Sequence, residues 1–552
     1  MTSTSEHSED GARKGNSGEE RATDPGLPDS LRLVLDPGTQ LLPGNNTEHV
    51  ALGGSPLRLM KLSTPAASVV LDLVAGKSVG EVAESLNRST RSVARLARRL
   101  LDAGMAHPRW VETSVDLKSV TIVIPVFQRE KALQRLLTSF GELLSQVAEV
   151  VVVDDGSPDA SGKVARSFGA RVVRHDAPRG PAAARNAGLD SVATPFVAFI
   201  DSDCVVDHDW LTPLLQHFAD PLVVVVAPRI GAISASTLSE TSGSSVSSGS
   251  SGSESAPKGR SHVEDILRAY EEVNSSLDLG AAEARVSPRT RVAYVPSAAL
   301  VGRTPALQSV GGFDTTMHVG EDVDLIWRLT ELGHGARYDP SAVVMHDHRT
   351  SLVPFVRRRF DYGSSAARLA KRHPGQVPPV AVSSWSGAAW ALVATCSPVG
   401  IAAGFAVAAG STAALPRKLS ALAHPTRESL KLATRGHLGA GRQLASAIWR
   451  SYLPVAVVAA IFSRRARRVL LVSAIVPNVQ QWRERRPRLD PIQYVGIRLL
   501  DDASYCVGVW RGCLDEKTIG PLVPDLTSWP GRRGTRTNAV DTIGSDRKTD
   551  EG

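Results

Sequence analysis

Val150-Val151-Val152-Val153-Asp154-Asp155-Gly156-Ser157 is a run of valines that stops on two carboxylates and a glycine, and it is the clearest indication of the fold. Phe199-Ile200-Asp201-Ser202-Asp203 repeats this pattern further along the chain. A buried parallel strand has this form where it delivers side chains to a ligand crevice. Asp201 and Asp203 point to the same side if the strand geometry persists through Ser202. Two hard oxygen ligands beside a crevice suit Mg²⁺ or Mn²⁺ holding a diphosphate, because neither ion needs a complete protein cage.

Both stretches belong to a longer alternation of apolar runs and helical stripes. Apolar side chains recur at helical spacing over residues 133–144, which predicts an amphipathic helix there. Strands and helices that alternate in this way predict right-handed crossovers and a parallel, Rossmann-like α/β sheet. The predicted strands are residues 120–125, 150–153, 170–174, 196–200 and 222–227, and further helices are expected at 160–168 and 182–191.

Length, charge and cysteine content set outer limits on the function. A chain of 552 residues exceeds one ordinary domain, so two or three units with tails are expected. The net charge of +7 and the pI of about 9.3 suit anionic partners without choosing among them. The four cysteines form no close CxxC pair, which favours a reducing compartment such as the cytoplasm and argues against structural zinc.

The N-terminal part of the chain predicts a small unit of its own. Residues 1–30 are polar and are expected to form a disordered tail rather than a signal peptide. Residues 31–110 contain a predicted strand at 31–35 and three short helices at 65–74, 79–86 and 90–103, which suggests a winged-helix unit. Its arginines, Arg88, Arg91, Arg95, Arg98 and Arg99, have few aromatic or amide readers beside them. A solvated helix face is therefore favoured over DNA binding, and no nucleic-acid partner is expected.

The remaining segments differ sharply in composition. Residues 234–258 are almost pure Ser and Gly, which predicts a flexible insertion without a catalytic role. Residues 363–528 are expected to be helical, and the uncharged stretch after His373 is long enough to span a bilayer. Basic residues flank that stretch on both sides, so a helical hairpin turning near Pro398 or a surface-lying pair fits better than one crossing. Association with the inner face of the cell membrane is favoured over a soluble bundle of buried helices. Residues 529–552 are predicted to form a disordered tail.

Five short motifs follow one another along the chain: Ile122-Val123-Ile124-Pro125-Val126-Phe127, Val153-Asp154-Asp155-Gly156-Ser157, Ala184-Arg185-Asn186-Ala187-Gly188, Asp201-Ser202-Asp203 and Gly320-Glu321-Asp322. Together they resemble family 2 glycosyltransferases of the GT-A fold over residues 118–362. The resemblance implies a metal-dependent enzyme that uses a nucleotide sugar. The QxxRW signature of processive polysaccharide synthases is absent, which argues against long-chain synthesis.

The resemblance assigns roles to individual side chains. It places the donor nucleotide against Pro125, Val126, Phe127, Asp154, Asp155, Arg185 and Asp201, with Asp155 contacting the base or ribose. Asp203 is the expected metal ligand, Asp201 contacts ribose or metal, and His346 is either a third ligand or a structural histidine. Asp322 is the expected general base and Glu321 orients the acceptor. Both acids are equally suited to the start of a helix, where carboxylates are favourable.

The order of the units narrows the resemblance further. A PqqD-like peptide-binding unit carrying Leu52-Gly53-Gly54-Ser55-Pro56 precedes the transferase, and a tail carrying Leu499-Leu500-Asp501-Asp502-Ala503-Ser504-Tyr505 follows it. This arrangement is similar to the mycofactocin-system glycosyltransferases. It implies an inverting enzyme that builds a β-1,4-glucan from UDP-glucose on a peptide-derived redox cofactor. Two alternatives stay open: transfer to a lipid-linked or cell-wall glycan, and a DNA-binding regulator fused to an inactive transferase.

Overall fold

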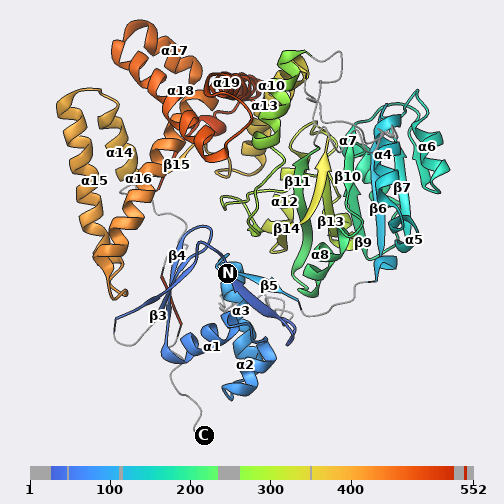
Figure 1. Ribbon diagram of the computed structural model, residues 1–552, viewed down its shortest axis with the longest axis horizontal. Coiled ribbons are helices and arrows are strands. Elements are labelled where there is room, and N and C mark those ends of the chain that lie inside the picture. The colour runs from blue at the N-terminus through green and yellow to red at the C-terminus, as the bar shows by residue number, and fades with distance from the viewer. Residues whose placement is uncertain are drawn as a thin grey trace, which may run out of the picture.

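The described chain folds into three units that meet near the centre of the molecule. In the computed structural model, residues 26–45, 49–110, 116–233, 261–347, 351–527 and 540–543 are described. Figure 1 shows a small N-terminal unit at the bottom, a sheet-containing unit at the right and a helical region at the upper left. The Ser/Gly segment 234–258 and the first 25 residues lie outside the described residues.

The N-terminal unit combines three helices with two small sheets. Its helices are α1 (Thr64–Val74), α2 (Val79–Ser85) and α3 (Thr90–Asp102), and its strands are β1 (Arg32–Leu35), β2 (Gln40–Pro43), β3 (His49–Gly53), β4 (Arg58–Leu62) and β5 (Ala106–Arg109). Each helix lies within one residue of its predicted bounds, because the start signals are local. Ser78 and Glu81 form a reciprocal capping box at α2, and the Ser89 hydroxyl accepts from the Ser92 N–H at α3. The meander β2–β3–β4 was not predicted from the sequence.

One arginine departs from the predicted solvated helix face. Arg91 and Arg95 are exposed, but Arg98 is buried and donates to both carboxylate oxygens of Asp220, at 2.6 and 2.8 Å. Asp220 belongs to the transferase unit, so Arg98 joins two units. Arg291 of the transferase unit likewise donates to Asp36 at 2.9 Å, which adds a second link. Bidentate Arg–carboxylate pairs fix geometry as well as adding energy, so the N-terminal unit is docked rather than loosely tethered.

The central sheet is mixed, which corrects the predicted all-parallel sheet. Strands β8, β7, β6 and β9 run parallel, as expected, but β13 pairs antiparallel with both β9 and β11. The order is β10-β14-β11-β13-β9-β6-β7-β8, with β12 on β14. The strand bounds are β6 Val120–Val126, β7 Glu149–Asp154, β8 Arg171–Arg174, β9 Phe196–Ile200, β10 Cys204–Val206, β11 Val223–Ala232, β12 Ala284–Val286, β13 Ala299–Arg303 and β14 Gly335–His346. Strand β12 and a loop, rather than a crossover helix, directly precede β13, so nothing imposes a parallel direction on it.

Helices cover this sheet, and two of them, α7 and α12, carry residues singled out from the sequence. They are α4 (Glu130–Phe140), α5 (Leu143–Gln146), α6 (Ser161–Ser167), α7 (Pro181–Asp190), α8 (Leu211–Gln216), α10 (His262–Asn274), α11 (Thr304–Ser309) and α12 (Glu321–Glu331). The apolar stripe predicted for residues 133–144 packs into the core, where Leu133, Leu136, Leu137 and Phe140 are fully buried. Strands β6, β7 and β9 run parallel side by side, so their carboxyl ends lie at one edge of the sheet.

The C-terminal region is helical and begins earlier than the predicted boundary at residue 363. Its helices are α13 (Leu352–Arg372), α14 (Ser384–Val393), α15 (Pro398–Lys418), α16 (Pro425–Arg450), α17 (Leu453–Phe462), α18 (Arg464–Arg485) and α19 (Pro491–Asp515). Helices α14 and α15 pack against each other across a turn just before Pro398, as the hairpin interpretation requires. By length and composition, α15 is the one described helix able to cross a membrane, or one of two spans if the bent pair α16–α17 counts as one.

Two short strands complete the described chain. Strand β16 (Asp525–Thr527) pairs with β15 (Ala381–Ser383). Strand β17 (Val540–Ile543) runs parallel to β4, inside the stretch predicted to be a disordered tail. The rest of that stretch lies outside the described residues.

Glycines allow α13 and α19 to pack backbone to backbone. A Cβ placed on Gly508 would lie 2.0 Å from the Phe360 carbonyl oxygen, and one on Gly512 would lie 2.3 Å from the Ser364 carbonyl oxygen. On the facing helix, a Cβ on Gly363 would lie 2.1 Å from the Tyr505 carbonyl oxygen. These contacts hold α19 against α13 at a separation that no larger residue permits.

Gly508→Ala should therefore destabilise the protein. Overpacking of this kind costs about 1–3 kcal/mol, so the midpoint of thermal or denaturant unfolding should fall clearly. Gly496→Ala is the matched control in the same helix, because a Cβ added there would meet no atom within 4 Å. That change should raise stability by up to about 1 kcal/mol through helix propensity. Equal effects of the two substitutions would contradict the close packing of α13 on α19.

Candidate active site

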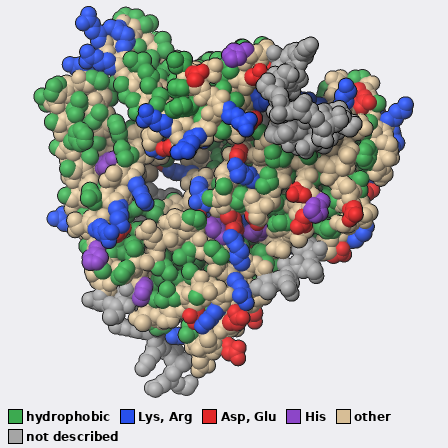
Figure 2. All heavy atoms as spheres, in the orientation of Figure 1, with side chains coloured by type: hydrophobic (Ala, Val, Ile, Leu, Met, Phe, Trp, Pro, Cys, Tyr) green, Lys and Arg blue, Asp and Glu red, His purple; other side chains and the backbone are tan. Residues whose placement is uncertain are grey.

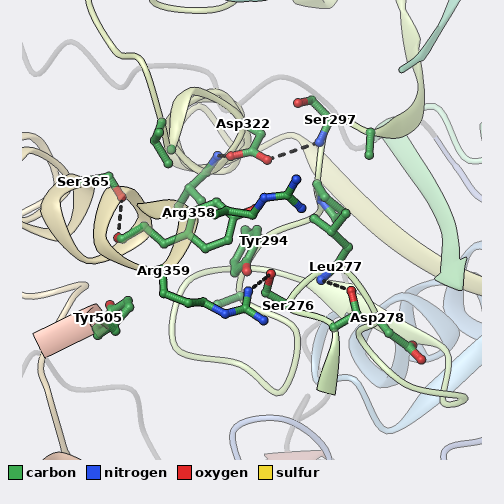
Figure 3. A pocket seen from close by; sticks show the side chains of 18 of the residues that line it. Ser276, Leu277, Asp278, Tyr294, Ser297, Asp322, Arg358, Arg359, Ser365 and Tyr505 are labelled. Atoms are coloured by element: carbon green, nitrogen blue, oxygen red, sulfur yellow. Dashed lines mark hydrogen bonds between the residues drawn. The ribbon is translucent and has the colours of Figure 1, made fainter. Parts of the chain in front are cut away.

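A cavity of ≈ 1140 Å³ opens where the sheet edge meets the C-terminal helices. Its lining brings together six of the residues singled out from the sequence: Arg185, Asp201, Asp203, Glu321, Asp322 and His346. Helices α13 and α19 supply the opposite wall (Figure 3). The other predicted residues, Pro125, Val126, Phe127, Asp154 and Asp155, do not line it. The cavity therefore unites the predicted metal and base residues.

Two carboxylates and an imidazole converge on one side of this cavity. Asp201 follows β9, Asp203 precedes β10, and the antiparallel register of β10 with β14 places Cys204 opposite His346. The Nε2 atom of His346 lies 3.3 Å from Oδ1 of Asp203. One potential ligand atom from each of the three residues lies within 4.8 Å of the others. Carboxylate oxygens with one imidazole form a donor set that suits a divalent cation, and the imidazole favours Mn²⁺ over Mg²⁺.

The charge state of Asp203 agrees with a ligand role. Burial would raise the pKa of the Asp203 carboxyl, but the hydrogen bond with His346 and the positive charges of His346, Arg129 and Arg358 together outweigh burial and hold the pKa below its ordinary value. Asp203 is thus ionised at neutral pH, as a metal ligand must be.

Arg185 connects the two sides of the site. Its guanidinium is buried and donates to Asp201 at 2.7 Å and to Glu321 at 3.1 Å. The same group lies over the Phe313 ring, 5.5 Å from its centroid. Arg185 lies in α7, and its long side chain reaches both Asp201, after β9, and Glu321, in α12. Arg185 therefore sets the spacing between the metal-side and base-side carboxylates.

Glu321 and Asp322 occupy the first turn of α12. The cap itself is Gly320, in the left-handed conformation at φ 84°, so neither acid is the N-cap residue. Asp322 accepts from the Ser297 N–H at 3.2 Å and from its neighbour Val323 at 2.8 Å. The helix-start interpretation and a chemical role are thus compatible, because Asp322 is held by the backbone and still lines the cavity.

Burial is the largest influence on the pKa values of Glu321 and Asp322. It raises the pKa of the Asp322 carboxyl above its ordinary value, although two backbone N–H groups and the Arg185 cation work against it. Burial and the neighbouring Asp322 charge also raise the pKa of Glu321. Raised carboxyl pKa values are what proton transfer near neutral pH requires.

The predicted nucleotide readers have partners within the chain. The Asp155 carboxylate accepts from the backbone N–H groups of Arg179 and Gly180, at 2.8 to 3.1 Å, and lies 2.6 Å from Nδ1 of His175. Asp154 is fully buried and pairs with Arg174. Both acids thus shape the loop after β8. Pro125 and Val126 are buried in β6, whereas Phe127, directly after it, is 42% exposed.

Sequence reasoning missed the wall contributed by the C-terminal helices. Figure 3 shows Arg358 extending into the cavity beside Asp322 and Tyr294, with Arg359 and Tyr505 below. Arg359 donates to Ser276 at 3.0 Å, and its Nε lies 3.2 Å from Asp501. The signals were the run 357–359, which matched no known signature, and the acidic pair in the tail motif at 499–505. Neither indicates on its own which distant unit it contacts.

Comparison with known proteins gives a match over nearly the whole chain. Residues 121–265 match the family described as Glycosyl transferase family 2. The chain is 40% identical over 510 residues to the pre-mycofactocin glycosyltransferase of Mycobacterium tuberculosis, covering 91% of this chain and 98% of that protein. It is 32% identical over 105 residues to the glycosyltransferase GlyA of Streptococcus pneumoniae, covering 18% of this chain and 15% of that protein.

Solved structures give more distant matches. A mannosyltransferase from Pyrobaculum calidifontis in complex with GDP-Man and Mn²⁺ matches over 76% of this chain and 93% of its own, at 15% identity and a TM-score of 0.41. The family match and the mixed sheet together identify the central unit as an α/β fold of the GT-A type, followed by a helical C-terminal region.

The carboxylate–imidazole cluster should bind Mn²⁺. Asp203→Asn should weaken Mn²⁺ binding, measured by electron paramagnetic resonance in the presence of UDP, by at least the tenfold or so that loss of an outer partner causes. Asp207→Asn is the control, since Asp207 is exposed near the same strand and pairs only with its neighbour His208 among the described residues. Unchanged Mn²⁺ affinity in Asp203→Asn would rule out the cluster as the metal site.

Proposed function

The chain belongs to the family of pre-mycofactocin glycosyltransferases, and on this premise we propose that it transfers a hexose, with inversion, from a nucleotide sugar to mycofactocin or its peptide-derived precursor. The proposed donor is UDP-glucose and the proposed linkage is β-1,4. The observation that carries the proposal is the single cavity in which Arg185 joins Asp201, on the metal side, to Glu321, on the base side.

In this reaction the acceptor hydroxyl attacks the anomeric carbon as the bond to the diphosphate breaks. Asp322 takes the hydroxyl proton, for which its raised pKa and its position on the cavity wall suit it. Glu321, fixed by Arg185, orients the acceptor. The leaving group is the nucleoside diphosphate, so one glycosidic bond forms for each sugar–phosphate bond broken.

The donor is proposed to lie between the metal cluster and β6. Asp201, Asp203 and His346 would hold the divalent cation. When bound, such an ion neutralises charge that develops on the departing diphosphate. Phe127 would stack on the nucleotide base, and the loop held by Asp155 would border the ribose. Asp154 supports that loop through Arg174.

The N-terminal unit is proposed to present the peptide-derived acceptor. Three helices with a small antiparallel sheet are compatible with a PqqD-type winged helix. Its firm docking through Arg98 and Asp36 would keep a bound peptide at a fixed distance from the cavity.

Two other classes of partner, a lipid-linked acceptor and DNA, have less support than the peptide-derived acceptor. The exposed apolar residues of the C-terminal helices favour a lipid-linked acceptor as the second candidate, in an enzyme working at the inner face of the membrane. A DNA-binding role for the N-terminal unit has less support, because Arg98 on α3 is already paired with Asp220.

Asp322→Asn should abolish most of the transfer while leaving donor binding largely intact. Loss of a general base costs roughly 10²–10⁴-fold in rate, measured as glycosylated product per unit time. Donor affinity is measured separately by calorimetry with the intact nucleotide sugar. Glu331→Gln, at the far end of the same helix, should behave like the parent protein. Normal turnover with lost donor affinity in Asp322→Asn would contradict the base assignment.

The pH dependence of transfer should show an acid limb displaced toward neutrality. The base must be deprotonated, so kcat/KM falls as the pH drops through the raised pKa of the buried acids. An ordinary carboxylate would give this limb near pH ~4. A rate that stays constant down to that pH, in protein shown to remain folded, would exclude these acids as the titrating groups.

A further inference from the structure

Helices α14 to α18 bury small and polar residues and expose many large apolar ones. Within these described helices, the buried residues are all small or polar: Ser386, Ala389, Gly400, Gly404, Glu428, Ser429, Ala440, Ala447, Ser473, Ala474 and Asn478. Large apolar side chains point outward instead, with Val399 at 80%, Phe405 at 70% and Phe462 at 83% exposure. Helix α4 of the transferase unit shows the opposite arrangement, because its buried residues are leucines and a phenylalanine. An exterior more apolar than the interior is typical of helices that face lipid.

Polar hydrogen bonds hold this interior together. His437 of α16 lies 3.0 Å from the Ser386 hydroxyl on α14 and 3.0 Å from the Ser411 hydroxyl on α15. Trp449 donates to the Ser473 hydroxyl on α18 at 3.1 Å. A Cβ on Gly404 would lie 2.7 Å from the Ala389 carbonyl oxygen, so α14 and α15 approach closely. Close approach at small residues and interhelical bonds between polar side chains are how helices associate when burial of apolar side chains contributes little.

The outward face of α18 carries basic residues at one end and apolar residues along the rest. Arg464 and Arg468 are one helical turn apart, and the same face continues through Val472 and Val476. Leu471 and Ile475 widen this stripe, and all four apolar side chains are exposed. Helix α17, immediately before it, is apolar throughout and has no buried residue.

Charge in this region is almost entirely positive. Glu428 is the only acidic residue between Asp361 and Glu484. Arg464, Arg465, Arg467 and Arg468 are all exposed at the junction of α17 and α18. Figure 2 shows Lys and Arg side chains gathered at the upper-left end of the molecule, next to hydrophobic ones. In Figure 1 the α14–α15 turn and the α17–α18 pair lie at this same end.

From these observations we propose that the α17–α18 junction and the start of α15 form a docking surface for an anionic lipid bilayer. Phe462, Ile461 and Phe405 enter the acyl boundary, while the arginine cluster binds lipid phosphates. The helices lie on the membrane surface and do not cross the bilayer. The reason is that Arg464 to Arg468 and Arg417–Lys418 place positive charge at both ends of the apolar helices. The inference deepens the proposed location at the inner membrane face and does not depend on which sugar or acceptor is used.

Sedimentation of the full chain with phosphatidylcholine vesicles, with and without phosphatidylglycerol, tests this surface. Binding should require the anionic lipid and weaken at high salt. Replacing Arg464, Arg465 and Arg468 together by Gln should weaken binding roughly a hundredfold, at the usual contribution of each arginine near a charged membrane. The matched control replaces Arg88, Arg91 and Arg95, which are equally exposed on α2–α3, and should bind like the parent.

A second pair of variants tests the apolar contribution. Ile461→Ser with Phe462→Ser should also weaken vesicle binding, whereas Leu332→Ser with Ile519→Ser, at exposed positions elsewhere, should not. Unfolding midpoints and sugar-donor turnover in vesicle-free solution are measured for every variant and should match the parent. Lost turnover with intact vesicle binding would count against the proposed reaction only.

Three results would overturn the proposed surface. One is vesicle binding that the arginine and apolar variants leave unchanged, and another is equal binding to neutral and anionic vesicles. The third is a stable dimer in solution with no vesicle binding, which would show that a second copy of the chain covers the apolar face.

Discussion

The active site depends on one buried cation. Arg185 holds Asp201 at 2.7 Å and Glu321 at 3.1 Å, and no more than 4% of its surface is exposed. Three of the carboxylates that line the cavity, Asp201, Glu321 and Asp322, interact with its charge, and without this positive charge their mutual repulsion would raise their pKa values and spread them apart. Removing one partner of a buried charge pair costs roughly 3–5 kcal/mol, so this arrangement is strongly fixed. The position of the proposed base relative to the metal cluster therefore follows from the reach of one side chain.

Much of the fold and the centre of the site could be predicted from local signals in the sequence. Asp201 and Asp203, after β9, line one cavity as the strand-end pattern predicted, whereas Asp154 and Asp155, after the valine run of β7, do not line it. Glu321 and Asp322 lie in the first turn of α12, the position predicted for them at the start of a helix. The pairing of β10 with β14 brings His346 beside Asp203, whereas the sequence offered His346 only through the family resemblance, as a metal ligand or a structural histidine.

What the sequence could not provide depends on contacts between distant segments. A carboxylate at a strand end can face a ligand or a neighbouring loop, and periodicity is identical in both cases. Asp155 faces the loop at residues 179–180, so its predicted contact with the nucleotide stays a prediction. The reversed direction of β13 and the buried pairing of Arg98 with Asp220 likewise arise from docking of separate segments.

The C-terminal helices link the cavity to a different kind of surface. Helix α19 closes the site through Asp501, which lies 3.2 Å from Arg359 and accepts from the Tyr270 hydroxyl at 2.9 Å. On the same helix, Asp502 accepts from Arg450 at 2.8 Å, and Arg450 lies over the Tyr505 ring. Through α16 and α18 this network continues into the helices whose apolar side chains face outward. One helical region thus forms both the wall of the cavity and the proposed membrane surface.

The reaction proposed for this cavity is transfer of hexose, with inversion, from a nucleotide donor to a peptide-derived acceptor. It is tested most directly by incubating the protein and Mn²⁺ with UDP-glucose and the mycofactocin precursor, then analysing the product by mass spectrometry and proton NMR. We expect a product that is heavier by hexose units and carries a β-anomeric linkage, formed in step with released UDP. An α-anomeric product, or UDP release that the precursor does not accelerate while a lipid-linked glycan does, would contradict it.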